Sequence, residues 1–365
     1  MNYSEYKQSS KLSSVWIEGR RFNQVQLKDW INVKTSSNYL LKIKQVYRNW
    51  FSDSLFFEVE TSGSTGAPKI IRLQKDKMYN SALKSLNYFE LRQGQKVLLA
   101  LPAEKIGGLM LIIRAIIGNL NLYHIKPRLD PLNLWNAEEI DFCSLTPSQL
   151  FAIKEEQLSL GKLRVIKRVL LGGSDINQAL SSFIQKENND FYHSYGMTET
   201  ISHVAIRKLN GMNRSAYFSA LEGISFKSND EDQLIICSDQ LLNKDLVTND
   251  IVTLIDKKTI LWRGRKDNVV NSGGIKLVVE EIEDKIKQLV KLPFYLVGIP
   301  DDLLGEKLVL MIEGVNFSQS ELKSLKLDFE GVLQKYEIPK DILMVSRFSY
   351  TANGKLIRTN PNQLS

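Results

Sequence analysis

The sequence predicts an α/β fold built from a large N-terminal domain of mixed sheets and helices, residues 1–264, and a small C-terminal α+β domain, residues 265–365. Strand and helix signals alternate as far as residue 196, as they do in α/β proteins. From Gln233 onward the signals change to short neighbouring strands, followed by a charged segment at residues 263–272. A length of 365 residues also favours two domains, at roughly 100–200 residues per domain.

In the N-terminal part, short apolar runs that end in turn residues indicate strands, and longer periodic runs indicate helices. The strands are expected at residues 56–60, 97–101, 169–171 and 191–193. The helices are expected at residues 76–89, 107–117 and 175–186. Aspartate is a favoured N-cap residue, so we expect Asp76 to cap the first of these helices.

The C-terminal part begins as an antiparallel region and ends as a compact α+β unit. The antiparallel strands are expected at residues 233–237, 252–255 and 259–262. The later elements are a helix at 279–289, strands at 294–299 and 307–312, a helix at 318–336 and a strand at 342–345. The charged segment between the two sets places the domain boundary near residues 263–267.

Composition restricts the partners of the chain. Its 48 basic and 41 acidic side chains give a net charge of +7, which fits either a solvated basic surface or a surface that attracts polyanions. We find no recognition-helix or single-strand-binding motif and expect no nucleic-acid partner. Cys143 and Cys237 lack a nearby metal-ligand partner, as in reduced cysteines of cytoplasmic proteins, and His124, His193 and His203 are too scattered for a metal site.

The sequence offers no candidate for a leader or a membrane span. The first ten residues are polar, whereas a secretory signal needs an apolar core. The longest apolar stretch, Leu109–Ile117, is interrupted by Arg114 and is far shorter than the ~20 residues of a membrane helix. We therefore expect a cytoplasmic protein.

The strongest chemical signal is the string TSGSTGAPK at residues 61–69. It combines four hydroxyl side chains, two glycines and one lysine, namely Thr61, Ser62, Gly63, Ser64, Thr65, Gly66 and Lys69. Hydroxyl and backbone N–H groups can donate to phosphate oxygens, glycines let the backbone approach them, and a lysine adds a positive charge. A flexible surface loop has a similar composition, but this order predicts a phosphate-binding loop that differs from the G-x-x-x-x-G-K-[ST] pattern.

This string resembles the phosphate loop of the adenylate-forming superfamily, which contains acyl-CoA synthetases, adenylation domains and luciferases. Further matches follow in the family's order and cover the chain from Thr61 to Arg358. The resemblance implies that a carboxylate attacks the α-phosphate of ATP to give an acyl-AMP, and that coenzyme A then displaces AMP. It also implies Mg²⁺ as a cofactor and a C-terminal domain that is mobile between the two half-reactions.

A second match is the run Ser194-Tyr195-Gly196-Met197-Thr198-Glu199. By resemblance, Tyr195 stacks on adenine, Thr198 bonds the α-phosphate and Glu199 helps to hold Mg²⁺. These roles are physically sensible, because an aromatic face suits a purine and a carboxylate suits a hard cation. The smaller string Gly172-Gly173-Ser174 resembles the loop beside the adenine ring.

The remaining matches lie in the C-terminal third of the chain. Asp250 resembles the aspartate that holds the ribose hydroxyls, although Asn249 stands where the family has glycine. Arg265 would contact ribose or phosphate, and Asp267 would be the hinge. The pair Gly273-Gly274 would face the thiol during thioester formation. Lys355, in Asn353-Gly354-Lys355, would reach the reacting carboxylate and neutralise charge there.

Two longer runs, residues 194–207 and 267–276, resemble the o-succinylbenzoate–CoA ligases of menaquinone biosynthesis, as does the compact length. Lys105 stands where many relatives have a histidine that gates the acyl pocket, and it could pair with a second carboxylate of the acid. A surface position for this lysine is the alternative. Arg114 is another candidate, although an arginine can extend to the surface. The acyl-pocket candidates are Lys105, Gly108, Arg114 and His203.

Two other functions remain open at this point. The chain could load an acid onto a carrier protein instead of coenzyme A, or it could be a non-catalytic nucleotide-binding regulator. Retention of the phosphate loop together with Glu199, Asp250, Arg265 and Lys355 argues against the regulator. The expected partners are a small carboxylic acid, ATP and coenzyme A, and a homodimer is one assembly that the sequence leaves open.

Overall fold

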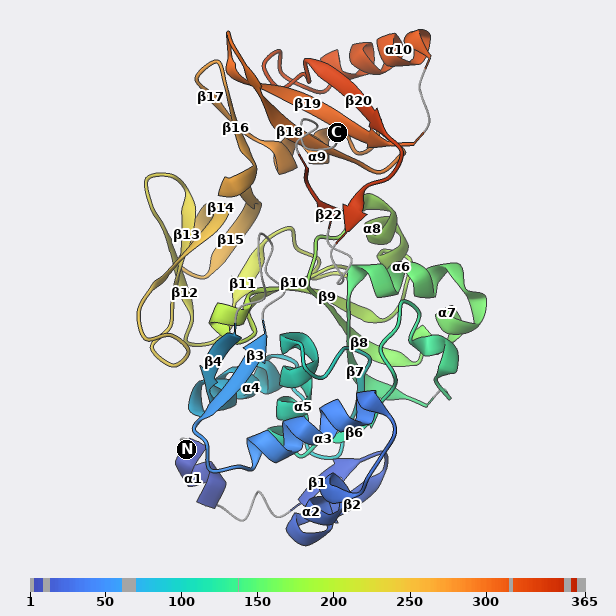
Figure 1. Cartoon of the computed structure of the whole chain (residues 1–365), viewed down its shortest axis with the longest axis vertical. Helices are drawn as coiled ribbons and strands as arrows, with labels where there is room; N and C mark the ends of the chain where they lie inside the picture. The colour runs from blue at the N-terminus through green and yellow to red at the C-terminus, as the bar shows by residue number, and fades with distance from the viewer. Residues whose placement is uncertain are drawn as a thin grey trace. The chain divides into compact units, whose positions relative to one another are not determined.

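The computed structural model describes residues 3–8, 14–60, 70–136, 138–314, 318–350 and 356–359. The chain divides into two compact units (Figure 1). Unit 1 comprises Met1–Ser225 and Cys237–Asp245, and unit 2 comprises Phe226–Ile236 and Leu246–Ser365. The predicted domain ranges, 1–264 and 265–365 with a hinge at Asp267, stay a prediction.

Unit 1 is organised around five parallel strands in the order β9-β8-β7-β5-β6. Their bounds are β5 (Lys96–Leu99), β6 (Asn121–His124), β7 (Ile140–Leu145), β8 (Ile166–Leu171) and β9 (Asp190–Gly196). Strands β10 (His203–Lys208) and β11 (Phe218–Ala220) extend the sheet antiparallel from β9. At the other edge β1 (Ser14–Ile17) joins β6, and β2 (Arg20–Asn23) joins β1.

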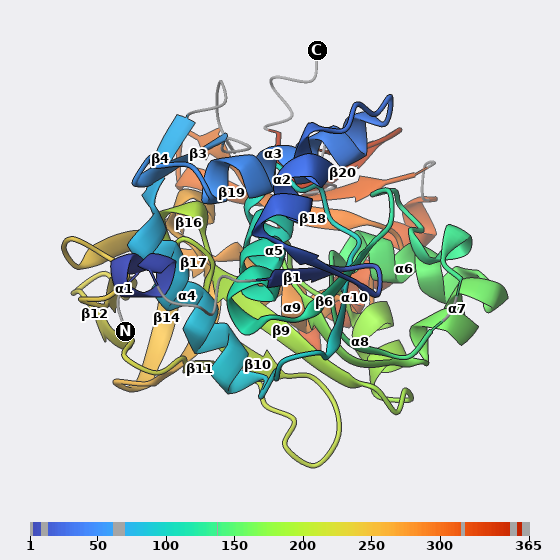
Figure 2. The ribbon, with the colours of Figure 1, turned by 90° about the horizontal axis from the view of Figure 1, so that it is seen from below.

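Helices cover both faces of these parallel strands, and Figure 2 shows α4 and α5 on one side and α6, α7 and α8 on the other. Successive strand residues point to opposite faces, so Leu98 and Cys143 pack with α6, α7 and α8, and Phe142 meets Phe89 at a ring distance of 4.8 Å. The helix bounds are α1 (Tyr3–Gln8), α2 (Gln24–Asn32), α3 (Asn38–Trp50), α4 (Lys75–Tyr88), α5 (Ile106–Gly118), α6 (Pro147–Glu155), α7 (Gln157–Leu163) and α8 (Gln178–Ile184). A hairpin, β3 (Phe56–Glu60) and β4 (Ile70–Gln74), precedes α4.

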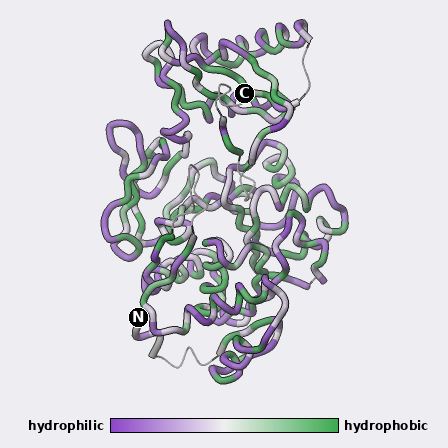
Figure 3. Tube along the Cα trace, in the orientation of Figure 1, coloured by the Kyte–Doolittle hydropathy of each residue, from purple (hydrophilic) through white to green (hydrophobic). Residues whose placement is uncertain are grey.

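The local sequence explains where these helices start and stop. Helix α6 begins at a capping box, in which Thr146 and Gln149 exchange side-chain and backbone hydrogen bonds at 3.0 and 3.1 Å. Apart from Arg114, helix α5 is apolar around its whole circumference; it is buried from Gly108 to Ile116 and ends at Asn119 in a left-handed conformation. Figure 3 shows hydrophobic segments running along the strands of each unit.

Unit 2 contains an antiparallel region and a compact α+β part. The antiparallel strands are β12 (Ser225–Ser228), β13 (Gln233–Cys237), β14 (Leu246–Asp256) and β15 (Thr259–Arg265). The α+β part has the strand order β17-β16-β19-β18, with β20 parallel to β19. Its elements are β16 (Val269–Ser272), β17 (Ile275–Val278), α9 (Val279–Ile286), β18 (Phe294–Asp301), β19 (Gly305–Glu313), α10 (Gln319–Glu330), β20 (Asp341–Val345), β21 (Ser349–Tyr350) and β22 (Leu356–Ile357).

The predicted α/β fold class is confirmed, but one predicted cap is wrong. Helix α4 starts at Lys75 with Gln74 as its N-cap residue, and Asp76 lies inside the first turn, where its carboxylate accepts from the Lys77 N–H at 2.8 Å. An acid in the first turn still interacts well with the helix dipole. Within the described part of the chain, no helix has the length and apolar character needed to cross a membrane.

Candidate functional site

Two predicted motifs meet at the carboxyl edge of the parallel strands in unit 1. Leu171, at the end of β8, lies opposite His193 of β9. The Ser194 hydroxyl donates to the Leu171 carbonyl oxygen at 3.0 Å. A Cβ atom on Gly172 would lie 2.5 Å from Ser194 Oγ, and Gly173 has a φ of +93°. The loop after β8 therefore needs both glycines and sits directly beside the end of β9.

His193 fastens this loop to the sheet. Its Nε2 lies 3.2 Å from the Ser174 carbonyl oxygen, and Arg207 Nη2 lies 3.0 Å from its Nδ1. A guanidinium can only donate, so Nδ1 accepts and Nε2 carries the proton. Burial, with a smaller contribution from Arg207, lowers the pKa of His193 to about 3. The ring is therefore neutral at physiological pH and serves as a bridge between Arg207 and Ser174.

Tyr195 is the last aromatic residue of β9. It is buried, and its ring centroid lies 5.8 Å from that of Phe218. The Arg207 guanidinium lies 4.6 Å from the Phe218 ring centroid, as in a cation–π contact. Gly196 ends β9 opposite His203 of β10. The predicted adenine-side residues are thus held together by packing with a neighbouring strand.

The segment after β9 forms a single 3₁₀ turn at Thr198–Thr200. The buried Thr200 hydroxyl lies 2.9 Å from the Met197 carbonyl oxygen and 2.7 Å from that of Ser202, which closes the turn. Ile201 follows with a φ of +69°, a rare value for a β-branched residue. The turn exposes Glu199 and leaves Thr198 half-buried, so both side chains can contact a ligand.

Arg114 is the most unusual charged residue of unit 1. It lies inside the apolar helix α5, is 2% exposed, and donates from Nη2 to Ser202 Oγ at 2.5 Å. Among the described residues its Nε has no acceptor and no carboxylate pairs with it. Burial lowers the pKa of Arg114 to about 9, so the group remains a cation at neutral pH. The alternative in which this side chain extends to the surface is wrong.

His203 adjoins Arg114 and completes a polar cluster inside unit 1. Its Nε2 lies 2.8 Å from Ser85 Oγ of α4, and its Nδ1 lies 3.4 Å from Ser202 Oγ. Burial, with a smaller contribution from Arg114, lowers the pKa of His203 well below its usual value, so the ring is neutral. We call Arg114, Ser202, His203 and Ser85 the buried polar cluster. Its four members combine one cation with three neutral hydrogen-bonding groups, which suits an anion.

The sequence pointed to Arg114 and His203 but missed Ser85 and Ser202. Ser85 belongs to no recognisable motif, Ser202 lies in the run 194–207 without an assigned role, and the contact from Arg114 spans 88 residues of sequence. The other two pocket candidates lie at the start of α5. Lys105 is its N-cap residue and half-buried, and a Cβ on Gly108 would lie 2.2 Å from the Pro102 carbonyl oxygen. Gly108 thus lets α5 pack on the preceding turn, and acyl-pocket roles for both residues stay predictions.

Asp250 of unit 2 is buried and held by several donors. The Trp262 indole Nε1–H donates to Asp250 Oδ1 at 3.1 Å, and Arg265 Nη1 lies 3.6 Å from the same oxygen. The register of β14 and β15 places Asp250 directly opposite Arg265. Trp262 was not predicted as a site residue, because a tryptophan in a strand more often signals packing than orientation of a carboxylate.

The predicted hinge residue belongs to the same network. Asp267 accepts from Arg265 Nη2 at 3.0 Å and from Asn249 Nδ2 at 3.2 Å. Asn249, the departure from the family pattern, therefore contacts the predicted hinge through its side chain. Arg265 lies between two carboxylates, which fixes its direction within unit 2.

Gly273 and Gly274 form the two-residue turn between β16 and β17. Their φ values are +59° and +82°, as in the hairpin turns that favour glycine at both positions. The turn itself therefore requires these glycines, and their predicted role in thioester formation stays a prediction. The phosphate loop at residues 61–69 and Lys355 lie outside the described residues.

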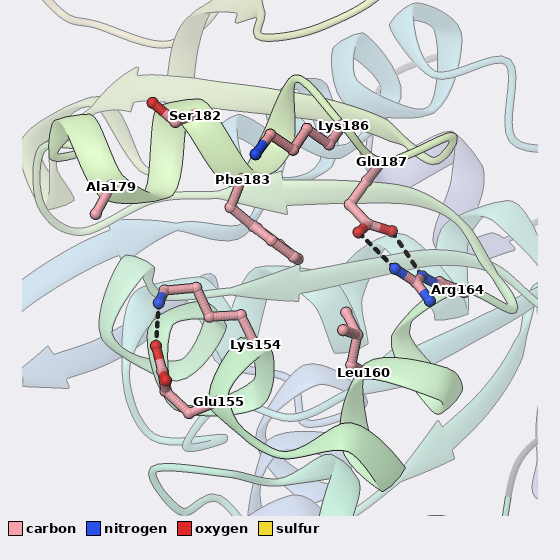
Figure 4. Close-up of a pocket in the computed structure, with 9 residues that line it drawn as sticks. All are labelled: Lys154, Glu155, Leu160, Arg164, Ala179, Ser182, Phe183, Lys186 and Glu187. Atoms are coloured by element: carbon pink, nitrogen blue, oxygen red, sulfur yellow. Dashed lines mark hydrogen bonds and ion pairs between the residues drawn. The ribbon is translucent and has the colours of Figure 1, made fainter.

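A surface cavity of about 490 Å³ lies between α6, α7 and α8 (Figure 4). Its lining residues are Lys154, Glu155, Leu160, Arg164, Ala179, Ser182, Phe183, Lys186 and Glu187. Arg164 and Glu187 pair at 2.9 Å across it, and its lining includes none of the predicted site residues that the structure describes. Within the described residues, no group of three or more histidine, cysteine or acidic side chains is placed to hold a metal ion.

Comparison with known proteins identifies the family. A family model described as AMP-binding enzyme matches residues 23–226, more than half of the chain. The 2-succinylbenzoate–CoA ligase of Listeria monocytogenes serotype 4b is 26% identical over 326 residues, which cover 82% of this chain and 68% of the relative. That of Lactococcus lactis is 27% identical over 320 residues, with 82% and 69% covered.

Solved structures agree with this result. An acyl-CoA synthetase (AMP-forming)/AMP-acid ligase II-like protein from Dyadobacter fermentans is 31% identical, with a TM-score of 0.64 and coverage of 92% of this chain and 96% of that one. The o-succinylbenzoate coenzyme A synthetase of Bacillus subtilis, at 21% identity, a TM-score of 0.69 and coverage of 84% and 69%, shows the same fold. The resemblance drawn from the motifs is confirmed, and the chain belongs to the AMP-binding enzyme family.

Proposed function

We propose that this chain activates 2-succinylbenzoate with ATP and Mg²⁺ to an acyl-AMP and then transfers the acyl group to coenzyme A. The carboxylate oxygen attacks the α-phosphorus, and the bond to the β-phosphate oxygen breaks to release pyrophosphate. A thiolate then attacks the acyl carbon, and AMP leaves. Several relatives named as 2-succinylbenzoate–CoA ligases support this choice, as does the synthetase of Bacillus subtilis that was solved with ATP and magnesium.

The buried polar cluster is the observation that carries the choice of acid. An acid with one carboxylate uses it at the α-phosphate, whereas 2-succinylbenzoate keeps a second carboxylate that needs a cation. Arg114 is 2% exposed and has no carboxylate partner among the described residues. Leaving a buried charge unpaired costs several kcal/mol, which an anionic ligand would offset. Ser202 and the neutral His203 could supply further hydrogen bonds to that anion.

For the nucleotide we propose the roles that the family resemblance implies. Tyr195, Gly172, Gly173 and Ser174 would surround adenine, and Thr198 would bond the α-phosphate. Asp250 would bind the ribose hydroxyls and Arg265 ribose or phosphate. Residues 61–69 would bind the phosphates, and Lys355 the reacting carboxylate. Two contacts support the assignments in unit 2. The Trp262 indole orients the Asp250 carboxylate, and the two carboxylates around Arg265 orient its guanidinium.

Glu199 is the proposed Mg²⁺ ligand. Magnesium usually takes one or two protein carboxylates together with phosphates and waters, so a single exposed carboxylate on a closed turn fits it. When bound, the ion would neutralise phosphate charge. The contribution of the chain is to hold Glu199 and Thr198 on one turn, fixed by the Thr200 hydroxyl and by Ile201.

The decisive experiment measures pyrophosphate release over a panel of acids, with and without coenzyme A. The panel pairs 2-succinylbenzoate with analogues in which one or the other carboxylate is esterified. We expect turnover only with the free diacid. Turnover that requires a carrier protein would favour the loading enzyme, and no turnover with any acid would favour the nucleotide-binding regulator. A cytoplasmic location and a homodimer also stay proposals, and light scattering of the purified protein tests the latter.

A further inference from the structure

Arg358 anchors the last described strand of unit 2 through a nearly enclosed ion pair. Its two terminal nitrogens donate to the two carboxylate oxygens of Glu283 in α9, the Nη2–Oε2 distance being 2.8 Å. Arg358 Nη1 also donates to the Leu296 carbonyl oxygen at 3.0 Å, and Glu280 Oε1 lies 3.8 Å from Nη2. The side chains of Arg358 and Glu283 are 21% and 17% exposed. The pair is therefore bidentate and largely shielded from solvent.

A second anchor acts on the neighbouring residue. The hydroxyl of Tyr295, on β18, donates to the Thr359 carbonyl oxygen at 2.9 Å and accepts from the Thr359 N–H at 3.3 Å. Tyr295 is 1% exposed and packs against Phe348 at a ring distance of 4.8 Å. The Arg358 guanidinium also lies 5.8 Å from the Tyr295 ring centroid. Residues 358 and 359 are thus joined to β18 and α9 by several side-chain hydrogen bonds.

These anchors lie at the base of a small hairpin. Strand β21 pairs with β22, with Ser349 opposite Ile357 and Tyr350 opposite Leu356. Leu356 also packs on the apolar cluster that contains Tyr295 and Phe348. In the sequence, Lys355 directly precedes β22 and is three positions from Arg358. The anchored strand β22 therefore begins at the residue that follows Lys355 in the sequence.

We propose that Arg358, Glu283 and Tyr295 form a clamp that positions Lys355 for acyl-AMP formation. This inference rests on the proposed function, in which Lys355 acts on the reacting carboxylate. A shielded ion pair is by itself weak support for stability, because desolvation offsets its attraction, but it does select one geometry. Here that geometry is imposed on the strand that follows the proposed catalytic lysine.

The clamp predicts a selective kinetic defect. A displacement of about 1 Å can cost ~10²-fold in rate. Acyl-AMP formation should therefore fall about 10²-fold when the clamp is opened. Thioester formation from supplied acyl-AMP does not use Lys355 and should stay within about twofold. A residue that only stabilised unit 2 would lower both half-reactions by the same factor.

The experiment compares four variants of the full-length protein. Arg358→Gln removes the cation, and the double variant Arg358→Gln with Glu283→Gln replaces the bidentate ion pair by two amides, so that Glu280 is the carboxylate that remains beside position 358. Tyr295→Phe deletes only the hydroxyl and should have a milder effect of the same kind. The matched control is Glu337→Gln, which breaks the 2.6 Å pair between Glu337 and Lys285 of the same helix α9, outside the hairpin.

Each half-reaction is measured separately with 2-succinylbenzoate, and amide hydrogen exchange follows residues 356–359. Selective loss of acyl-AMP formation in the first three variants, with faster exchange in β22 and neither change in Glu337→Gln, supports the clamp. Equal loss of both half-reactions, or unchanged exchange in β22, overturns it. If the unaltered protein forms no acyl-AMP from any acid, the proposed function fails, and the exchange data still decide whether Arg358 and Tyr295 hold β22.

Discussion

Two arginines of this chain that are largely shielded from solvent, Arg114 and Arg358, have opposite surroundings. Arg358 of unit 2 meets both oxygens of Glu283 and lies near Glu280, whereas Arg114 of unit 1 has a single serine contact and no carboxylate among the described residues. The first arginine uses its charge within the fold. The second arginine keeps its positive charge without a carboxylate partner in the described part of the fold, so we infer that its partner is a bound anion. An arginine that is largely shielded from solvent can therefore mark either a structural anchor or a binding site, and its partner decides which.

The largest expected effect tests the binding side of this comparison. Replacing Arg114 with Met should lower kcat/KM for 2-succinylbenzoate by roughly 10²- to 10⁴-fold, since removing one partner of a buried charge pair costs ~3–5 kcal/mol. The free energy of unfolding should stay the same or rise, because an unpaired buried charge is removed. Steady-state kinetics and urea unfolding measure the two quantities.

The control for this change is Arg92→Met, at an exposed arginine of the same unit, which should alter neither quantity. A loss of stability in Arg114→Met without a loss of kcat/KM would contradict a ligand-binding role. It would mean that Arg114, like Arg358, has a structural role.

The second effect tests the structural side. Burial raises the pKa of Glu283, and the ion pair with Arg358 opposes that rise, so Arg358→Gln should raise the pKa further. A carboxyl with a raised folded-state pKa stabilises the fold fully below its ordinary value of about 4.3 and loses this contribution as the pH rises through the folded-state pKa. Arg358→Gln should thus cost about 3–5 kcal/mol at pH 8 and progressively less towards pH 5.

Urea unfolding of Arg358→Gln and of the unaltered protein at several pH values measures this dependence. The double variant with Glu283→Gln should lose the pH dependence, because it has no carboxyl at position 283. The same loss of stability at every pH would mean that Glu283 does not retain an unpaired charge.

A third prediction concerns the charge of Arg114 itself. Burial is the main cause of the low pKa of His203, and Arg114 is the second. Arg114→Met should therefore raise the pKa of His203, although burial keeps it below the ordinary value. His193 provides the internal control, because burial and Arg207 set its pKa and Arg114 does not contribute. Titration of the ring resonances by NMR distinguishes the two histidines.

The smallest expected effect is at Asp250. Trp262→Phe keeps an aromatic ring but removes the indole donor to the carboxylate, a hydrogen bond worth roughly 1.5 kcal/mol because one partner is charged. The KM for ATP should rise about tenfold at most, with little change in kcat. A fall in kcat at unchanged KM would show that Trp262 acts on the reacting groups and not on ribose binding.

The sequence located features that are encoded locally. The strings around Tyr195 and Asp250 carry their chemistry within a few residues, and the apolar run of α5 made the single charge at Arg114 conspicuous. Contacts between distant residues carry no such signal. The meeting of Arg114 with Ser202, the indole donor to Asp250 and the anchoring of Arg358 by Glu283 all depend on how strands and helices pack. The misplaced cap at Asp76 lies two positions after the observed N-cap residue, Gln74, which is also the last residue of β4, so the strand leads directly into the helix.

The backbone of Ile201 has a consequence for how this protein can evolve. A β-branched residue at a φ of +69° stores roughly 1–3 kcal/mol of strain, beside the turn that presents Glu199. Selection for heat resistance at this position should therefore return glycine, which adopts that conformation easily. Such a substitution would raise the thermal stability but make the turn less rigid, and it would lower the catalytic rate. Mutant libraries that are screened for activity on new acids should therefore start from the protein with Ile201 and not from a stabilised variant at this position.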